Sequence, residues 1–224
     1  PADDTHPTRS LVMGDIARVN DANVTLDVEV SGSSAIERLD VFRGRELIDT
    51  VRLYTSDTLG RRIRLTMEGA DYRGRSRPPT WDGTLTVAGN AITRSEMFNN
   101  WNLDRGIQSA TTDAIAWKAV TTGNWCGIDL WLDDANSGEL AIETPHVTTQ
   151  HAISDIGLED LVIDGGGLER QIKLYRLPDQ PEGNHIRHQI TIDVAETGDT
   201  PVFVRVTQVD GHKMWSSPIY LYRN

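Results

Sequence analysis

The chain has 224 residues, enough for one large or two small domains with a buried core. Its 22 Lys and Arg residues against 33 Asp and Glu residues give a formal net charge of −11, which opposes approach to nucleic acid or to an anionic membrane surface. The single cysteine, Cys126, excludes an internal disulfide framework and cysteine-rich zinc sites.

Alternation of apolar and polar residues with a period of two predicts short, half-buried β-strands along the chain. The first clear run is "NVTLDVEV", in which Leu26, Val28 and Val30 share one face. The pattern recurs in chain order in residues 61–69, 127–134, 170–177, 188–194 and 201–209. Turn-forming stretches such as "SGSS", "DANSG" and "ETGDTP" separate the runs. The sequence therefore predicts an all-β protein, an antiparallel β-sandwich of immunoglobulin-like or jelly-roll-like type.

Helical signals are scarce, and the domain boundaries are expected at proline-rich stretches. Only "SDIGLEDL" is compatible with a helical turn, with Ser154 as its cap. Pro78 and Pro79 in "RSRPPTWDG" and the stretch "LPDQPEGNH" interrupt the strand pattern. We therefore expect residues 10–90 together with 186–224 to form the sandwich, and residues 91–185 to form a second β-rich layer or inserted subdomain.

The sequence gives no membrane signal. No apolar run reaches the roughly 18 residues that a membrane helix needs, so no membrane span is expected. The opening residues "PADDTHPTRS" are polar and lack the pattern of a signal peptide. The compartment stays open between the periplasm, the extracellular space and the cytoplasm.

The closing stretch "VDGHKMWSSPIYLYRN" has two interpretations, a reactive cluster or a hairpin with its return strand. Asp210 and Gly211 lie between two β-rich runs, which is the signature of a hairpin turn. His212 then falls near the tip, Trp215 starts the return strand, and Pro218 predicts an edge strand or a bulge. A reactive Ser–His pair needs an orienting carboxylate and an oxyanion donor, and the local sequence signals neither. The hairpin is the favoured interpretation.

Three stretches resemble the C-terminal β-rich region of a bacterial family of unknown function: "AIERLDVFRGRELIDTVRL", "PPTWDGTLTVAGNAI" and "VFVRVTQVDGHKMWSSPIYLY". Longer members of that family carry an upstream domain similar to the metal-dependent phosphoesterases of the polymerase and histidinol phosphatase type. The resemblance runs from about "SLVMGDI" to the end of the chain. It implies an accessory module of a metal-dependent hydrolase, and it transfers no active-site residue to this chain.

Tryptophan is concentrated in the middle of the chain. Five of the six tryptophans occur there: Trp81, Trp101, Trp117, Trp125 and Trp131. Exposed rings together with the amides of Asn99 and Asn100 in "FNNWNLDRG" would suit a carbohydrate site, with Trp101, Trp125 and Trp131 as stacking platforms. The alternative is that these rings fill the core or an interface, and core or interface is the favoured interpretation.

The acidic turn "LDDANSGELAIE" offers the oxygen ligands that calcium prefers, from Asp133, Asp134 and Asn136. Its spacing departs from the EF-hand pattern, and a hairpin turn rich in Asp and Asn explains the same residues without a metal. Calcium is the one cofactor weighed, and the favoured interpretation is that the chain binds none.

The remaining reactive residue types are expected to be structural. The six histidines form no HxH or HExxH motif, and the spacings of His146 with His151 and of His185 with His188 place the two rings of each pair on opposite strand faces. The apolar neighbours of Cys126 predict a buried core residue. The arginines form one cluster, expected on a solvated face or docked on an acidic upstream domain: Arg61, Arg62, Arg64, Arg73, Arg75 and Arg77.

Three functions follow in order of preference. The first is a non-catalytic accessory or interaction module, whose partner is the upstream catalytic domain or a second copy through self-association. The second is a carbohydrate-binding module that uses the Trp-rich middle segment. An enzymatic role for this chain alone ranks last, because no nucleophile, metal set or acid–base pair is better explained by catalysis than by structure.

Overall fold

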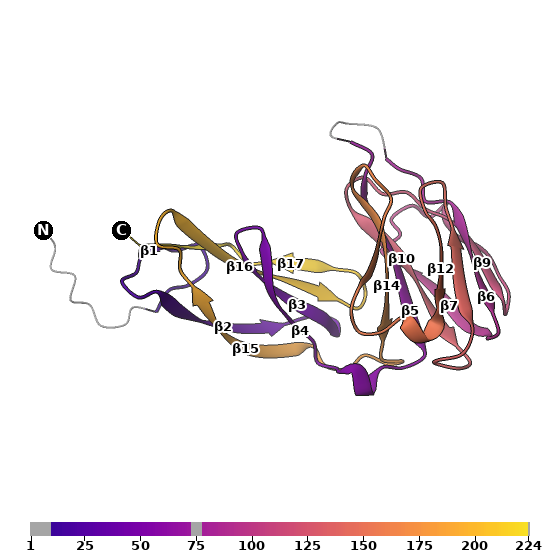
Figure 1. The fold of residues 1–224 in the computed structure, drawn as a ribbon, viewed down its shortest axis with the longest axis horizontal. Coiled ribbons are helices and arrows are strands. Elements are labelled where there is room, and N and C mark those ends of the chain that lie inside the picture. The colour runs from indigo at the N-terminus through magenta and orange to yellow at the C-terminus, as the bar shows by residue number, and fades with distance from the viewer. Residues whose placement is uncertain (1–9, 73–77, 224) are drawn as a thin grey trace, which may run out of the picture. The chain divides into compact units, whose positions relative to one another are not determined.

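The computed structural model describes residues 10–72 and 78–223, which form β-strands and two short 3-10 turns (Figure 1). The chain divides into two compact units. Pro1–Leu53 and Glu182–Asn224 make up the first, here called the terminal unit, and Tyr54–Pro181 make up the second, here called the inserted unit. The all-β prediction is confirmed. Within the described ranges, no helix is long and apolar enough to cross a membrane.

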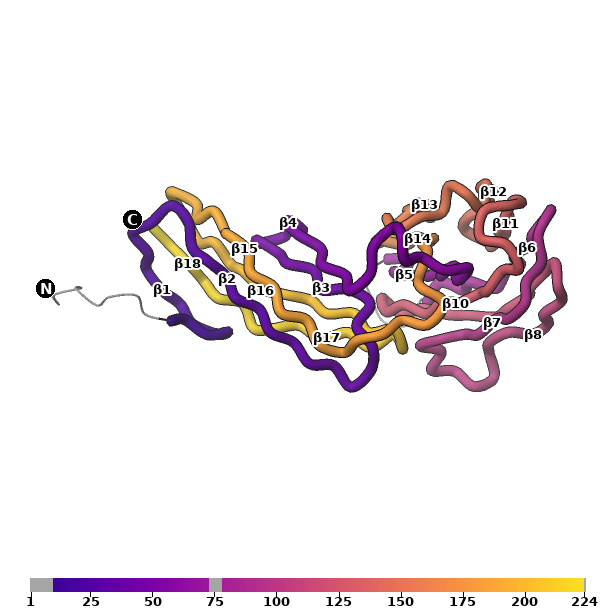
Figure 2. The backbone as a smooth tube through the Cα atoms, turned by 90° about the horizontal axis from the view of Figure 1, so that it is seen from below, coloured from indigo at the N-terminus to yellow at the C-terminus, as the bar shows by residue number. Residues whose placement is uncertain are grey.

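The terminal unit combines strands from both ends of the chain, drawn in indigo and in orange to yellow in Figure 1. Its strands are β1 (Ile16–Arg18), β2 (Asn23–Ser31), β3 (Ile36–Arg43), β4 (Glu46–Val51), β15 (His185–Asp193), β16 (Asp199–Gln208), β17 (Lys213–Trp215) and β18 (Ile219–Tyr222). Six of them form one sheet in the order β1-β18-β16-β3-β4, with β17 paired to β16. The other two, β2 and β15, form a two-stranded sheet. Strand β1 runs parallel to β18, beside which it lies in Figure 2, and the other pairs are antiparallel.

The two sheets of the terminal unit bury their apolar faces against each other. Val28 and Ile186 of the two-stranded sheet pack with Leu39 and Val206 of the six-stranded sheet. A second cluster, which includes Val41, extends this core. Strands β2 and β15 facing β18, β16 and β3 reproduce the B–E against G–F–C arrangement of immunoglobulin-type sandwiches. In the sequence, the inserted unit follows β4 and precedes β15 of the terminal unit.

The inserted unit is a second antiparallel sandwich, built from two five-stranded sheets. Its strands are β5 (Arg62–Ala70), β6 (Gly83–Ala88), β7 (Ile92–Phe98), β8 (Gly106–Ala110), β9 (Ala114–Lys118), β10 (Trp125–Leu132), β11 (Glu139–Glu143), β12 (Thr148–Ala152), β13 (Leu161–Asp164) and β14 (Leu168–Leu177), and its turns are η1 (Ser56–Thr58) and η2 (Ile153–Asp155). The sheet orders are β13-β14-β5-β10-β7 and β12-β11-β6-β9-β8. One core cluster joins the sheets and includes Leu65, Ile128, Leu140, Trp81 and Trp117. The side chains that alternation predicted to face inward on β5, β10 and β14, such as Leu65, Ile128 and Leu174, lie in this core.

The division between the units falls after Leu53, whereas the sequence placed a boundary near residue 90. Strand β5 pairs with β10 and β14, and β6 pairs with β9 and β11. Both strands therefore belong to the inserted unit. These partners lie far along the chain, and the local pattern of residues 54–90 does not reveal them.

The closing stretch forms the predicted hairpin, but its return strand begins at Lys213 and Trp215 is its last residue, not its first. Gly211 N donates to Gln208 O, and β17 returns antiparallel to β16. Pro218 lies between β17 and β18, where the return strand is interrupted and Ser216 donates its backbone N–H to Val204 O. The expected helical turn is present as η2, but Ser154 does not cap it, because Ala152 occupies the N-cap position. Arg176 instead binds the carbonyls of Ile153 and Ile156.

Candidate interaction site

The loop between β7 and β8 presents two large apolar side chains to solvent. Trp101 is 61% exposed and Leu103 is 95% exposed. Leu103 is more exposed than any other large hydrophobic residue in the described ranges, where sandwich side chains of this kind are mostly buried. We call residues 99–105 the apolar loop.

Side-chain amides hold the apolar loop in one conformation. Asn100 Nδ2 donates to the carbonyls of Asn102 and Arg105, at 3.1 and 2.9 Å. Asp104 N donates to Asn102 Oδ1 at 3.0 Å, and Asn99 Nδ2 donates to Trp125 O at 2.6 Å. Asn99 has φ 50°, a left-handed conformation that Asn tolerates better than most residues. The loop is therefore tied to its own backbone and to β10.

Arg105 fixes the other end of the loop. Its Nη1 donates to Asp82 Oδ1 at 3.0 Å and to Ala119 O at 3.3 Å. Gly106 follows with φ +134°, a conformation that favours glycine. Trp101 and Leu103 thus project from a loop that is anchored at both ends. A preordered loop loses less conformational entropy when it binds a partner than a flexible loop does.

The three tryptophans considered for a sugar platform have different surroundings. Trp101 is exposed, whereas Trp125 is buried and packs edge-to-face on Phe98 with ring centroids 5.9 Å apart. Trp131 is half-buried between the guanidinium groups of Arg62 and Arg94, 4.9 and 4.3 Å from the ring centroid. Asn99 and its hydrogen bond to β10 bring Trp101, Asn100 and Trp125 into one neighbourhood. No such contact places Trp131 there among the described residues.

A buried charge cluster lies on the β5–β10–β7 sheet. Asp129 on β10 accepts from Arg62 Nη2 at 2.6 Å and from Arg64 Nε at 2.8 Å. Each of these three side chains is less than one tenth exposed. The guanidinium of Arg64 also stacks on Phe98, 4.0 Å from the ring centroid. The expectation that these arginines lie on a solvated face is wrong for Arg62 and Arg64.

The other arginines of the cluster differ from Arg62 and Arg64. Arg61, the third described member, is half-exposed and donates its backbone N–H to Asp179 Oδ1. Arg73, Arg75 and Arg77 lie outside the described residues. The pairing of Arg62 and Arg64 with one aspartate more than 60 residues away carries no local signal in the sequence.

The acidic turn between β10 and β11 is closed by hydrogen bonds within the protein. Asp134 Oδ1 accepts from the backbone N–H groups of Asn136 and Ser137, and these bonds lower the pKa of this carboxyl. Asn90 Nδ2 donates to the carbonyls of Asp134 and Ser137, at 2.7 and 2.8 Å. The side chain of Asn90 therefore binds the backbone of the turn that contains Asp133, Asp134 and Asn136.

The titratable residues are dispersed. In residues 10–72 and 78–223, no three His, Cys, Asp or Glu side chains are grouped to hold a metal ion. His151 Nε2 lies 2.7 Å from Thr149 Oγ1, and His185 Nδ1 lies 3.1 Å from Ser31 Oγ. Cys126 is buried as predicted, and burial raises the pKa of its thiol to about 12. His6 lies outside the described residues.

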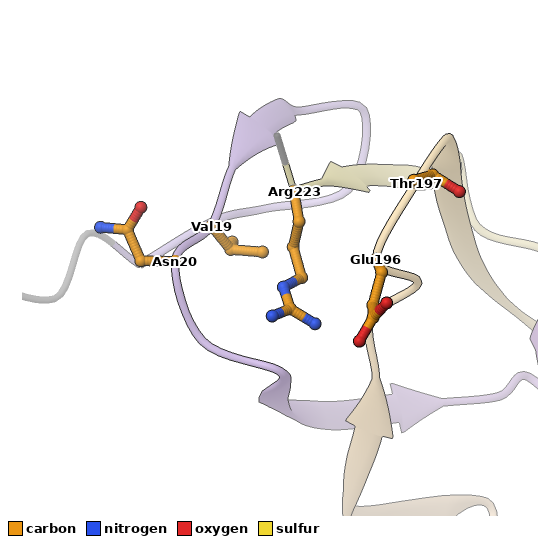
Figure 3. Close-up of a pocket in the computed structure, with 5 residues that line it drawn as sticks. All are labelled: Val19, Asn20, Glu196, Thr197 and Arg223. Atoms are coloured by element: carbon orange, nitrogen blue, oxygen red, sulfur yellow. The ribbon is translucent and has the colours of Figure 1, made fainter.

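A shallow open depression of about 390 Å³ lies in the terminal unit near the end of β18 (Figure 3). Its lining residues are Val19, Asn20, Glu196, Thr197 and Arg223. The side chains of Arg223 and Glu196 extend into the same space in Figure 3. The depression is polar and open, so it lacks the enclosed apolar walls of a typical small-molecule site.

Comparison of the chain with protein-family models, with curated proteins and with solved structures finds no match. The sequence had already singled out Trp101, Asn99 and Asn100, which the apolar loop brings together. Leu103 was missed, although an aliphatic residue inside the polar stretch "NNWNLDRG" is the signal that could have identified it.

Proposed function

We propose that this chain is a non-catalytic accessory module that binds a partner protein through the apolar loop. The observation that carries the proposal is the exposure of Trp101 and Leu103 on a loop anchored by Asn100 and Arg105. Tryptophan is enriched among the residues that dominate binding energy at protein interfaces. A preordered loop with an aromatic and an aliphatic side chain suits such a contact.

The partner we propose is the catalytic domain of a metal-dependent hydrolase in the same, longer protein. Support comes from the resemblance of residues 35–53, 78–92 and 202–222 to the C-terminal region of the unassigned bacterial family. An accessory sandwich in that position would orient or stabilise the catalytic domain. The chemistry would belong to that upstream domain, and the module would contribute binding.

The hydrogen bonds of the loop favour a protein partner over a sugar. A carbohydrate site needs polar groups that are free to bind hydroxyls beside the stacking ring. The amide nitrogens of Asn99 and Asn100 already donate to backbone carbonyls. Of the two exposed side chains that follow, Leu103 offers no polar atom and Asp104 offers one carboxylate. These side chains are therefore better suited to an apolar protein contact.

The first experiment measures the mass of the native polypeptide by immunoblot with an antibody against this chain. A band well above 24.9 kDa is expected if the chain is part of a longer hydrolase. The upstream segment is then titrated with this chain by calorimetry. The Trp101→Ala/Leu103→Ala variant should bind at least about tenfold more weakly, as expected for loss of two central interface residues. A native band at the mass of this chain would remove the enzyme context.

Carbohydrate binding is the second candidate, favoured by the exposed ring of Trp101 beside Asn99 and Asn100. A panel of soluble glycans should then change the tryptophan fluorescence of the chain, and Trp101→Phe should remove that change. Trp215→Phe is the matched control, because Trp215 is 60% exposed on the terminal unit. A response that Trp101→Phe abolishes would favour the sugar over the protein partner.

A further inference from the structure

One face of the six-stranded sheet in the terminal unit carries a band of apolar side chains. Alternation points Val41 and Val202 toward the two-stranded sheet, so their neighbours along β3 and β16 point to the opposite face. The residues of this opposite face, here called the aromatic face, are Ile16, Phe42, Leu47, Phe203, Trp215, Tyr220 and Tyr222. Within the described part of the terminal unit, the second sheet covers only the inner face.

Strand register makes the aromatic face continuous across the sheet. Ile16 lies beside Tyr220, and Tyr220 lies beside Pro201 on β16. Two residues further along β16, Phe203 lies beside Phe42, which in turn lies beside Leu47. The rings of Phe42 and Phe203 stack with centroids 5.0 Å apart and an interplanar angle of 6°. Because these two rings face each other, they present their edges outward, which suits packing against another apolar layer better than stacking on a flat sugar ring.

The amount of apolar surface fits the centre of a protein interface. Five side chains of this face are substantially exposed: Ile16 (73%), Leu47 (50%), Trp215 (60%), Tyr220 (38%) and Tyr222 (37%). At about 200 Å² for a fully accessible large side chain, these fractions amount to roughly 500 Å². A stable interface buries about 800 Å² on each partner, of which the apolar centre is the larger part.

The charged side chains of the aromatic face include both signs: the cations Arg18, Arg38, Arg205 and Lys213 and the anions Asp40 and Asp199. Asp40 accepts from Arg205 Nη2 at 2.7 Å and from Thr50 Oγ1 at 2.9 Å. By register, Arg18 and Asp199 flank Tyr222 on either side. Two copies of a chain with net charge −11 repel at long range, so a face that is not acidic is a more favourable place for them to meet than the acidic rest of the surface.

We propose that the aromatic face binds the aromatic face of a second copy of the chain, around a two-fold axis near Phe42 and Phe203. Such a contact is isologous: the same patch of each copy meets itself, so the dimer closes. It would pack two six-stranded sheets face to face, as the sheets of a sandwich do. The inference goes beyond the binding of a partner through the apolar loop and does not depend on it.

Sedimentation velocity of the 224-residue chain from about 1 to about 500 μM tests the proposal, because this range spans micromolar affinities. A concentration-dependent dimer is expected. Leu47→Glu/Tyr220→Glu should abolish it, because both side chains lie on the aromatic face, and circular dichroism checks that the variant is folded. Val162→Glu is the matched control, because Val162 is 51% exposed on β13 of the inserted unit and lies on neither proposed surface; it should leave the dimer unchanged.

A second measurement keeps the test independent of a single variant. Leu47→Lys/Tyr220→Lys should also be monomeric alone, whereas a mixture of the acidic and basic variants should restore a heterodimer, detectable by native mass spectrometry. A chain that stays monomeric at every concentration, or a dimer that survives Leu47→Glu/Tyr220→Glu, would overturn the proposal. Either result would leave binding through the apolar loop to be judged by its own titration.

Discussion

His188 on β15 and Asp49 on β4 join the two sheets of the terminal unit, with Nε2 and Oδ2 2.8 Å apart. The chain leaves this unit after β4 to form the inserted unit and returns to it before β15. Arg43 Nη1 and Asp193 Oδ2, 3.9 Å apart, make a second polar contact between the sheets, which otherwise meet mainly through apolar side chains. The His188–Asp49 contact therefore links β4, after which the chain departs, with β15, at which it returns.

A double-mutant cycle on His188→Ala and Asp49→Ala should show a favourable coupling of about 0.5–1 kcal/mol, because both side chains are partly exposed and water screens the pair. Urea unfolding of the wild type, both single variants and the double variant supplies the four free energies. Additive single variants would show that the contact contributes nothing to stability.

Asp129→Asn should destabilise the inserted unit by about 3–5 kcal/mol, because it leaves the buried guanidinium groups of Arg62 and Arg64 without their shared carboxylate. The matched control is Glu96→Gln on the adjacent strand. Glu96 is half-exposed and pairs with Arg94, so its substitution should cost less than about 1 kcal/mol. Comparable losses for the two variants in denaturant unfolding would contradict the assignment of Asp129 as the centre of the cluster.

The strands and their inward faces follow from the sequence, but what lies over their outward faces does not. Alternation correctly assigns Leu65 and Ile128 to the core of the inserted unit. The same alternation places Arg64 and Asp129 on the opposite face, where a solvated surface is the ordinary expectation. Both are buried there, and each compensates the charge of the other across two strands that are adjacent in the sheet but 65 residues apart in the sequence. Local patterns do not record such pairings.

For the candidate site, the sequence predicts the residue types but not the conformation of the loop that carries them. The residue types of "FNNWNLDRG" identified Trp101, Asn99 and Asn100 as a polar and aromatic group. Whether the amide of Asn100 is free or bound to the loop depends on the loop conformation, which the sequence does not fix. The exposure of Leu103 depends on the same conformation.

His146 should make the stability of the inserted unit depend on pH. Burial is the main cause that lowers the pKa of its imidazole, and the ring packs edge-to-face on Trp81 with centroids 5.2 Å apart. Below the ordinary histidine pKa of about 6.5, the unfolded chain therefore binds the proton more readily than the folded chain. The free energy of unfolding should consequently fall as pH drops from about 7.5 toward 5.

His146→Phe tests this dependence, because it keeps a ring against Trp81 and removes the titrating group. The buried Nε2 of His146 has no hydrogen-bond partner in the described part of the chain, so the variant should lie within about 1 kcal/mol of the wild type at neutral pH. Urea unfolding at several pH values should show a smaller loss of stability on acidification for His146→Phe. An unchanged pH dependence would contradict the role of His146.

Calcium should leave the stability of the chain unchanged. The side chain of Asn90 already makes hydrogen bonds to the turn that contains Asp133, Asp134 and Asn136. Its Nδ2 donates to two carbonyls, and its Oδ1 accepts from the backbone N–H groups of Ala91 and Asp134. A metal ion would have to displace these bonds. Thermal unfolding with about 1 mM calcium, and again with a chelator, should give the same melting temperature, since sites of extracellular affinity bind in this range.

Asn90→Ala separates the two explanations of this turn. If Asn90 closes the turn, the variant should lose about 0.5–1.5 kcal/mol, because it removes hydrogen bonds to exposed backbone groups of Asp134 and Ser137 and to the partly buried N–H of Ala91. Added calcium should not recover that loss, because the liganding oxygens would no longer be held in place. A melting temperature that rises with calcium in the wild type, and rises more in Asn90→Ala, would instead identify the acidic turn as a metal site.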